Sequence, residues 1–358
     1  MGDEEAVRSE EFVNGGTDVL SSSRHSASSS DHLVVMVHGI LGSTADWQYG
    51  ADQFVKALPD KVIIHCSECN GYTLTLDGVD VMGERLAEEV IGVINRRPGL
   101  KKISFIAHSM GGLAARYAIG RLYRTSSGKL VGNPSDGVCA GDNTTGTIYG
   151  LEAMNFITVA TPHLGSRGNG QVPLFFGVTA LEKVAASVSH WIFKRTGKHL
   201  FLTDNDEGET PLLQRMVNDH GNIYFMSALG AFKRRVAYAN VGYDHIVGWR
   251  TSSIRHNSEL AVWEDSSSKE YPHIVRVEHS KAVNADKCHE ASDVSCYSDV
   301  LEEELVTGLS RVSWEKVDVS FQSSIQRFVA HNAIQVQYAF MHSEGADVIQ
   351  HMIDHFIT

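Results

Sequence analysis

The sequence predicts an α/β fold with a mostly parallel sheet flanked by helices and with a helical cap inserted in it. Apolar runs at 33–37, 62–66 and 103–107 have the near-continuous hydrophobicity of strands buried on both faces of a parallel sheet. Between the second and third runs, apolar residues recur at helical spacing from 78 to 95. A strand, a helix and a strand in this order predict parallel strands joined by a right-handed crossover.

Length and composition fit one large domain or two small ones, preceded by a polar tail. The chain has 358 residues, of which 42% are hydrophobic and 21% charged, enough to bury a sizeable core. Residues 1–31 are polar and serine-rich without hydrophobic periodicity, which predicts a disordered tail. Residues 32–358 are expected to form the folded domain, with a cap or lid insertion at about 167–235 and an irregular insertion at about 250–310.

Charge and cysteine content limit the partners and the compartment. The formal net charge is −12 and there is no basic stripe, which argues against a nucleic-acid partner because nothing would neutralise its phosphates. Five cysteines are too few for a disulfide framework and favour a reducing compartment. Neither a signal peptide nor an apolar stretch long enough to cross a bilayer is visible. We therefore expect a cytoplasmic protein, and peripheral attachment to membranes stays open.

The most informative motif is Ala-His-Ser-Met-Gly-Gly at 107–112, which ends the third strand and precedes an alanine-rich helical segment. A strand, a very sharp turn and a helix with serine at the apex form the nucleophile elbow of α/β-hydrolases. Gly111 and Gly112 supply the small residues that the strained turn needs, and Ala107 stands where glycine is commoner. An ordinary turn that happens to contain a serine is also conceivable, but the flanking strand and helix favour Ser109 as a nucleophile.

The first strand leads into a second glycine-rich loop, His-Gly-Ile-Leu-Gly at 38–42. In α/β-hydrolases, this loop and the residue after the nucleophile each supply one backbone N–H of the oxyanion hole. By that logic the donors are the amides of Ile40 and Met110, which would stabilise the developing oxyanion. The side chains and backbone expected to line the substrate site are those of His38, Gly39, Leu41, His108, His163 and Leu164.

His163 lies in Thr-Pro-His-Leu-Gly-Ser at 161–166, after the strand at 155–160. It comes too early in the chain to be the base in the order serine, acid, histidine, so we expect it to shape the loop beside the site. Further on, an apolar stripe at helical spacing runs through 174–192. Such a stripe fits plain core packing, and it also fits a cap whose apolar face receives an acyl chain.

The acid and the base are predicted from their places after later strands. Asp244 directly follows the strand at 235–241, on a loop where its carboxylate could orient a histidine, although an aspartate can also simply cap a turn. His331 lies between the last predicted strand, 314–321, and the final helix, 346–356, and His342 is the second candidate.

Two other pairs resemble metal ligands. Cys66 and Cys69 form a C-x-x-C pattern, and His351 and His355 are four residues apart on the final helix. Neither pair has further ligands at a matching spacing, so we predict no metal site and no cofactor.

These motifs together resemble the lipase-like serine esterase family of α/β-hydrolases that is labelled domain of unknown function 676. The likeness rests on 38–42, 107–112, 160–166 and 243–244, with 330–332 adding to it, and covers residues 32–250 well. It implies an α/β-hydrolase fold in which Ser109 is the nucleophile, Asp244 the acid and His331 the base.

The resemblance and the motifs predict a serine hydrolase of carboxylic esters, a lipase or esterase that acts on hydrophobic acyl esters through an acyl-enzyme. An acyl thioesterase or a transacylase would share that intermediate. Two hypotheses of a different kind are a catalytically inactive binding module with this fold and a metal-dependent hydrolase. The expected partners are a hydrophobic ester and, as a further candidate, a membrane or lipid-droplet surface.

Overall fold

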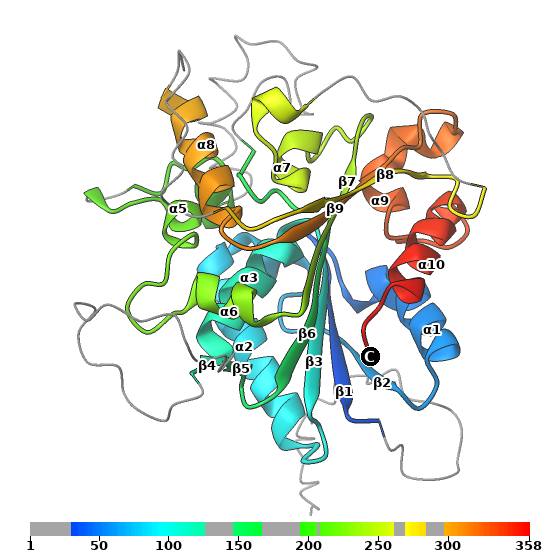
Figure 1. Ribbon diagram of the computed structural model, residues 1–358, viewed down its shortest axis with the longest axis horizontal. Helices are drawn as coiled ribbons and strands as arrows, with labels where there is room; N and C mark the ends of the chain where they lie inside the picture. Colours follow the sequence, from blue (N-terminus) through cyan, green and yellow to red (C-terminus); the bar gives the residue numbers. More distant parts are fainter. Residues whose placement is uncertain (1–29, 126–145, 167–193, 206–207, 261–268, 284–296) are drawn as a thin grey trace, which may run out of the picture.

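The computed structural model describes residues 30–125, 146–166, 194–205, 208–260, 269–283 and 297–358 (Figure 1). The predicted disordered tail, except for its last two residues, lies outside these ranges. The apolar stripe at 174–192 lies outside them as well, since the described chain resumes only at 194.

Among the described residues, a seven-stranded sheet has the order β2-β1-β3-β6-β7-β9-β8. All neighbouring strands are parallel except β8, which pairs antiparallel with β9. The predicted α/β fold with a mostly parallel sheet is confirmed. The strands are β1 (His32–Val37), β2 (Val62–Cys66), β3 (Lys102–His108), β6 (Glu152–Val159), β7 (Arg234–Asn240), β8 (Ile274–Ser280) and β9 (Trp314–Val319).

Two helical layers cover the sheet, one on each face (Figure 1). One layer contains α2 (Val79–Asn95), α3 (Met110–Leu122) and α6 (Phe225–Ala231), and the other contains α1 (Gln48–Ala57) and α10 (Ala346–Asp354). The remaining described elements are α5 (Leu212–Arg215), α7 (Trp249–Ser253), α8 (Tyr297–Leu309), α9 (Ala330–Ala333) and the two-stranded ribbon of β4 (Tyr123–Arg124) and β5 (Thr147–Ile148), together with short 3-10 turns. No helix in the described part of the chain is long and apolar enough to cross a membrane.

The strand β1 shows how the sequence produces this layering. Its side chains alternate between the two faces, so Leu33 and Val35 join the core beneath α2 and α3, while Val34 and Met36 join the core beneath α1 and α10. All four are fully buried. A central strand therefore has to be apolar at every position, which is why its sequence is readable as a parallel strand.

The region 250–310, expected to be irregular, contains regular elements where the structure describes it. β8 is an edge strand with one neighbour, and only Ile274 and Val275 are buried in it, so its sequence lacks the apolar run of a central strand. In α8, Leu301, Leu305 and Leu309 recur every four residues and pack into the same core as α3. The sequence pattern did not predict either element, because their few buried positions are spread among charged ones.

The carboxyl ends of β1, β3, β6 and β7 lie at one edge of the sheet because these strands are parallel. The loops that leave this edge are those at 38–42, at Ser109, at 160–166 and at Asp244. Residues far apart in the sequence are thereby brought to one place, as is usual for sites in open α/β sheets.

Candidate active site

Ser109 sits in a sharp turn between β3 and α3. Its backbone has φ 52° and ψ −129°, a conformation that side-chain-bearing residues rarely adopt, and its N–H donates to the Val159 carbonyl at 2.8 Å. A Cβ at Gly111 would overlap the main chain of Val37 and His38, and one at Gly112 would overlap Thr161. The glycines are needed because backbone and side chains pass close to the turn, as the sequence predicts.

The hydroxyl of Ser109 faces the imidazole of His331, which α9 carries. The distance from His331 Nε2 to Ser109 Oγ is 3.1 Å, and His331 Nδ1 lies 3.0 Å from Asp244 Oδ2. A neutral imidazole that donates its Nδ1–H to the carboxylate leaves Nε2 free to accept the serine proton. The structure thus brings together the three side chains that the sequence suggests as nucleophile, acid and base.

Asp244 is held as an ionised acceptor. Its Oδ1 accepts the amides of Ile246 and Val247 at 3.0 and 2.8 Å, while Oδ2 accepts the side-chain amide of Asn240 at 2.9 Å. Burial by itself raises the pKa of this carboxyl, but His331, Val247 and Asn240 together outweigh burial and hold the pKa below its ordinary value. Asp244 therefore caps a turn and faces the histidine at the same time, so the two roles considered for this residue are compatible.

The amides of Ile40 and Met110 are available where the oxyanion hole is expected. Neither amide has an acceptor among the described residues, whereas the next amide, that of Leu41, donates to Thr75 Oγ1 at 2.9 Å. Met110 is the first residue of α3, and the first N–H groups of a helix lack partners within it. Their role as donors to an oxyanion stays a prediction.

His108 and His38 are buried beside the triad. The Nε2 of His108 lies 2.8 Å from the His331 carbonyl oxygen, and the centres of the two rings are 4.6 Å apart. Burial, strengthened by the nearby His331, lowers the pKa of His108 well below its ordinary value, so the ring is neutral. The Nδ1 of His38 contacts the Gly39 carbonyl at 2.9 Å, and Leu41 is half exposed. The His108 side chain thus contacts the backbone of His331 rather than the hydroxyl of Ser109.

His163 and Leu164 are fully buried in the loop after β6. The His163 Nε2 lies 2.9 Å from Thr158 Oγ1, its ring packs on Trp314, and burial lowers its pKa well below the ordinary value. Thr251 of α7 holds the loop, accepting the Leu164 amide at 2.9 Å and donating to the Gly165 carbonyl at 2.9 Å. The neutral His163 side chain is part of the core, which fits a loop-shaping role.

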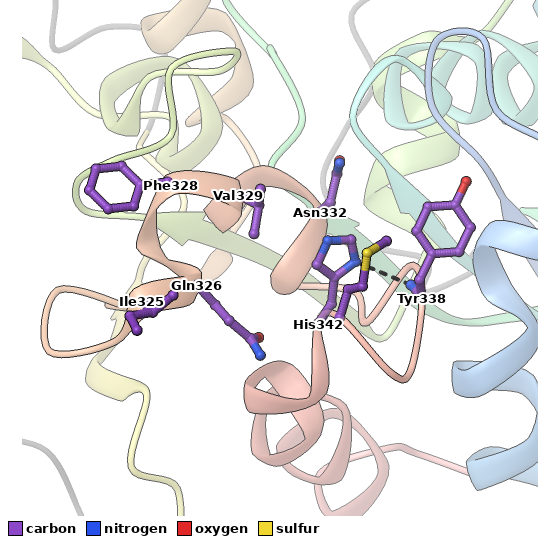
Figure 2. Close-up of a pocket in the computed structure, with 8 residues that line it drawn as sticks. Ile325, Gln326, Phe328, Val329, Asn332, Tyr338 and His342 are labelled. Atoms are coloured by element: carbon purple, nitrogen blue, oxygen red, sulfur yellow. Dashed lines mark hydrogen bonds between the residues drawn. The ribbon is translucent and has the colours of Figure 1, made fainter.

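His342, the second candidate for the base, lies in a different place. Its Nδ1 accepts the Tyr338 amide at 3.2 Å, and its ring lines an open groove of about 520 Å³ (Figure 2). No hydrogen bond joins His342 to Ser109 or Asp244 among the described residues, whereas His331 is within hydrogen-bond distance of both. The other residues that line the groove are Ile325, Gln326, Phe328, Val329, Asn332, Tyr338 and Met341.

Exposed apolar side chains surround this edge of the sheet, and we call them the apolar rim. They lie on or beside the three segments that carry Ile40, Asp244 and His331, and Phe340 is 98% and Ile325 88% exposed. Arg327 lies 5.3 Å from the ring of Tyr243 and so joins two of these segments. The rim consists of Leu41, Tyr243, Ile246, Ile325, Phe328, Val329, Tyr338, Phe340 and Met341.

Sequence reasoning missed the rim and Asn240. The segments 325–329 and 338–341 contain apolar residues that do not follow the period of a buried helix or strand. Apolar residues without such a period were the available signal for exposed apolar side chains. Asn240 ends the buried strand β7, and a polar side chain at the carboxyl end of such a strand was the signal there.

Comparisons with known proteins found a matching family and relatives that are named as lipases. The family model described as "Putative serine esterase (DUF676)" matches residues 27–255. "Putative lipase C4A8.10" of Schizosaccharomyces pombe is 29% identical over 256 residues, which cover 69% of this chain and 29% of that protein. "Putative lipase ROG1" of Saccharomyces cerevisiae is 31% identical over 229 residues, which cover 62% of this chain and 28% of that protein. The matched part of the chain therefore spans less than a third of the length of these relatives.

Likenesses to solved structures are weak. The mature lipase BlEst2 of Bacillus licheniformis is 15% identical with a TM-score of 0.35, over 62% of this chain and 69% of that one. The esterase Pf2001 of Pyrococcus furiosus is 14% identical with a TM-score of 0.34, over 63% and 66% of the two chains.

Proposed function

Because the chain belongs to the family described as "Putative serine esterase (DUF676)", we propose that it is a serine hydrolase of carboxylic esters in which Ser109 is the nucleophile, His331 the base and Asp244 the acid. The observation that supports this most is the pair of hydrogen bonds that runs from Ser109 through His331 to Asp244. The strained turn at Ser109 is a second support, since a serine that only capped a helix would not need it.

In the proposed acylation step, Ser109 Oγ attacks the ester carbonyl carbon while His331 Nε2 takes the hydroxyl proton. The carbonyl oxygen becomes an oxyanion, and the amides of Ile40 and Met110 donate to it. Collapse of the tetrahedral intermediate breaks the bond to the alcohol oxygen, which takes the proton back from Nε2. Asp244 stays ionised throughout and stabilises the imidazolium.

In the proposed deacylation step, water replaces the alcohol. His331 Nε2 takes a proton from the water as its oxygen attacks the acyl-serine, and returns that proton to Ser109 Oγ as the carboxylic acid leaves. An acyl thioesterase would use the same steps on a thioester, and a transacylase would replace water by another acceptor.

The apolar rim supports the proposal that the substrate is a hydrophobic acyl ester and that the protein binds this substrate at a lipid surface. Transfer of side chains such as Phe340 and Ile325 out of water is favourable, and these side chains flank the segment that carries His331. A chain with a net charge of −12 would be repelled by anionic lipids, so the proposed surface is uncharged or zwitterionic. A cytoplasmic location remains a prediction from the cysteine content.

Covalent labelling of Ser109 by a fluorophosphonate tests the proposal. The wild-type protein should be labelled at residue 109 and should hydrolyse p-nitrophenyl esters, with medium-chain acyl groups preferred over acetyl. Ser109→Ala should lose both properties with its melting temperature nearly unchanged. A folded wild-type protein that the probe does not label would instead be an inactive binding module.

A further inference from the structure

Provided that the proposed function holds, we infer that Asn240 and His108 are positioning residues that together fix His331. The hydrogen bonds of both side chains go to the acid or to main chain, and none goes to Ser109. They hold consecutive carbonyl groups of α9, the four-residue helix that carries the base. The inference goes beyond the triad because it explains how a base on so short a helix keeps its place.

Asn240 links the acid to the segment of the base. It is the last residue of β7 and is buried, and its Nδ2 lies 2.9 Å from Asp244 Oδ2 and 3.3 Å from the Ala330 carbonyl oxygen. One amide nitrogen has two hydrogens, so it can donate to both acceptors at once. With the amide reversed, its oxygen would face a carboxylate and a carbonyl, which cannot donate. Only the orientation with the nitrogen toward both is consistent.

The other end of the Asn240 amide supports a positioning role. Its Oδ1 is buried without a hydrogen-bond partner among the described residues. A buried acceptor without a partner costs stability, and an apolar side chain of similar size would avoid that cost. The presence of an asparagine at position 240 is therefore better explained by the two hydrogen bonds of its nitrogen than by packing.

His108 holds the next carbonyl from another strand. It is the last residue of β3, and its Nε2 lies 2.8 Å from the His331 carbonyl oxygen. Because the ring is neutral and must donate to a carbonyl, its proton is on Nε2. β3 and β7 are separated by β6 in the sheet, so α9 is held by two strands that are not neighbours. A helix of four residues cannot fix its own direction, and these two bonds add to the core packing of Ala330 and Ala333 in fixing it.

The experiment measures the rate of fluorophosphonate labelling of Ser109 against probe concentration and pH in Asn240→Leu. The labelling rate at saturating probe should fall roughly 10- to 100-fold, because the base is displaced. The probe concentration that gives half of the maximal rate should change little, because the binding surface is intact. The pH midpoint of labelling should rise, since Asp244 loses a donor and its charge then stabilises the imidazolium more. Among the described residues, the ionisable side chains that contact His331 are Asp244 and the neutral His108.

Asn155→Leu is the matched control. Asn155 is a fully buried asparagine of the neighbouring strand β6, and its amide donates to Ser104 Oγ and the Ile357 carbonyl at 2.9 and 2.8 Å. This variant should lose melting temperature but keep the labelling rate and pH midpoint. Asn240→Leu with a wild-type rate and midpoint, or losses in both variants that only follow melting temperature, would overturn the inference. A wild-type protein without labelling would refute the proposed function itself.

A second pair of variants tests His108. In His108→Gln the side-chain nitrogen can still reach the His331 carbonyl, so most of the labelling rate should remain. In His108→Leu the donor is lost, and the rate should fall roughly tenfold or more. Equal rates in the two variants would show that the hydrogen bond does not position the base.

Discussion

The two halves of the proposed catalytic edge are built in different ways. At β1 and β3, backbone fixes the site: Ser109 stands in a strained turn, and Gly111 and Gly112 let main chain and side chains meet closely. At β7 and α9, buried side chains fix it: Asn240 and Asp244, with His108 from β3, hold the base through hydrogen bonds. The first, which we call the backbone half, carries the proposed nucleophile and depends on local sequence. The second, the side-chain half, carries the proposed base and depends on contacts between distant residues.

The largest expected effect concerns the side-chain half and tests which of two histidines is the base. His331→Ala should lower kcat for a p-nitrophenyl ester by roughly 10⁴-fold or more, because the imidazole that would take the Ser109 proton is gone. His342→Ala should stay within a few-fold of wild type, since that ring lines the groove of Figure 2. The measurement is steady-state kinetics with melting temperature as the folding check. Comparable losses in both variants would contradict the assignment of the base.

The backbone half is tested by adding a single methyl group. A Cβ at position 111 would meet the main chain of Val37 and His38, which cannot move aside without displacing β1. Gly111→Ala should therefore cost about 1–3 kcal/mol of unfolding free energy or more, and should also slow labelling of Ser109. Denaturant unfolding measures the first effect.

Gly99→Ala is the control for that variant. A Cβ there meets nothing within 4 Å, and Gly99 is not among the glycines with positive φ. Its unfolding free energy should stay at or above the wild-type value, because alanine restricts the unfolded chain. If Gly111→Ala were equally stable, close backbone packing would not be what holds the turn.

This difference explains what the sequence could and could not predict. The α/β fold, the turn at Ser109 and the central strands follow from short apolar runs and glycine spacing, which act locally. The residues themselves predicted Asp244 and His331 by their order after strands, and the family resemblance added to that. His342 stayed open because the local pattern around His331 is weak. Asn240 was missed, since its role arises from bonds to residues 4 and 90 positions away. β8 and α8 were missed because an edge strand and a half-buried helix need few apolar residues.

The smallest expected effect concerns the apolar rim, whose most exposed members, Phe340 and Ile325, flank the base in the side-chain half. Phe340→Asp should weaken binding to phosphatidylcholine vesicles roughly tenfold or more, because an aromatic side chain that leaves water contributes about 2 kcal/mol. Vesicle co-sedimentation measures the binding. Hydrolysis of a short water-soluble ester should stay at the wild-type rate, because Phe340 is 98% exposed and is not among the residues bonded to the triad.

Val300→Asp is the matched variant for this test, since it changes an exposed apolar residue of α8, which lies across the molecule from α9 (Figure 1). Its vesicle binding should equal that of the wild type, because the same charge is added far from the rim. Equal losses in Val300→Asp and Phe340→Asp would mean that added negative charge, rather than the lost aromatic contact, weakens binding. Unchanged binding in both would mean that the rim around His331 does not contact the lipid surface. Another face of the protein would then have to bind the vesicles.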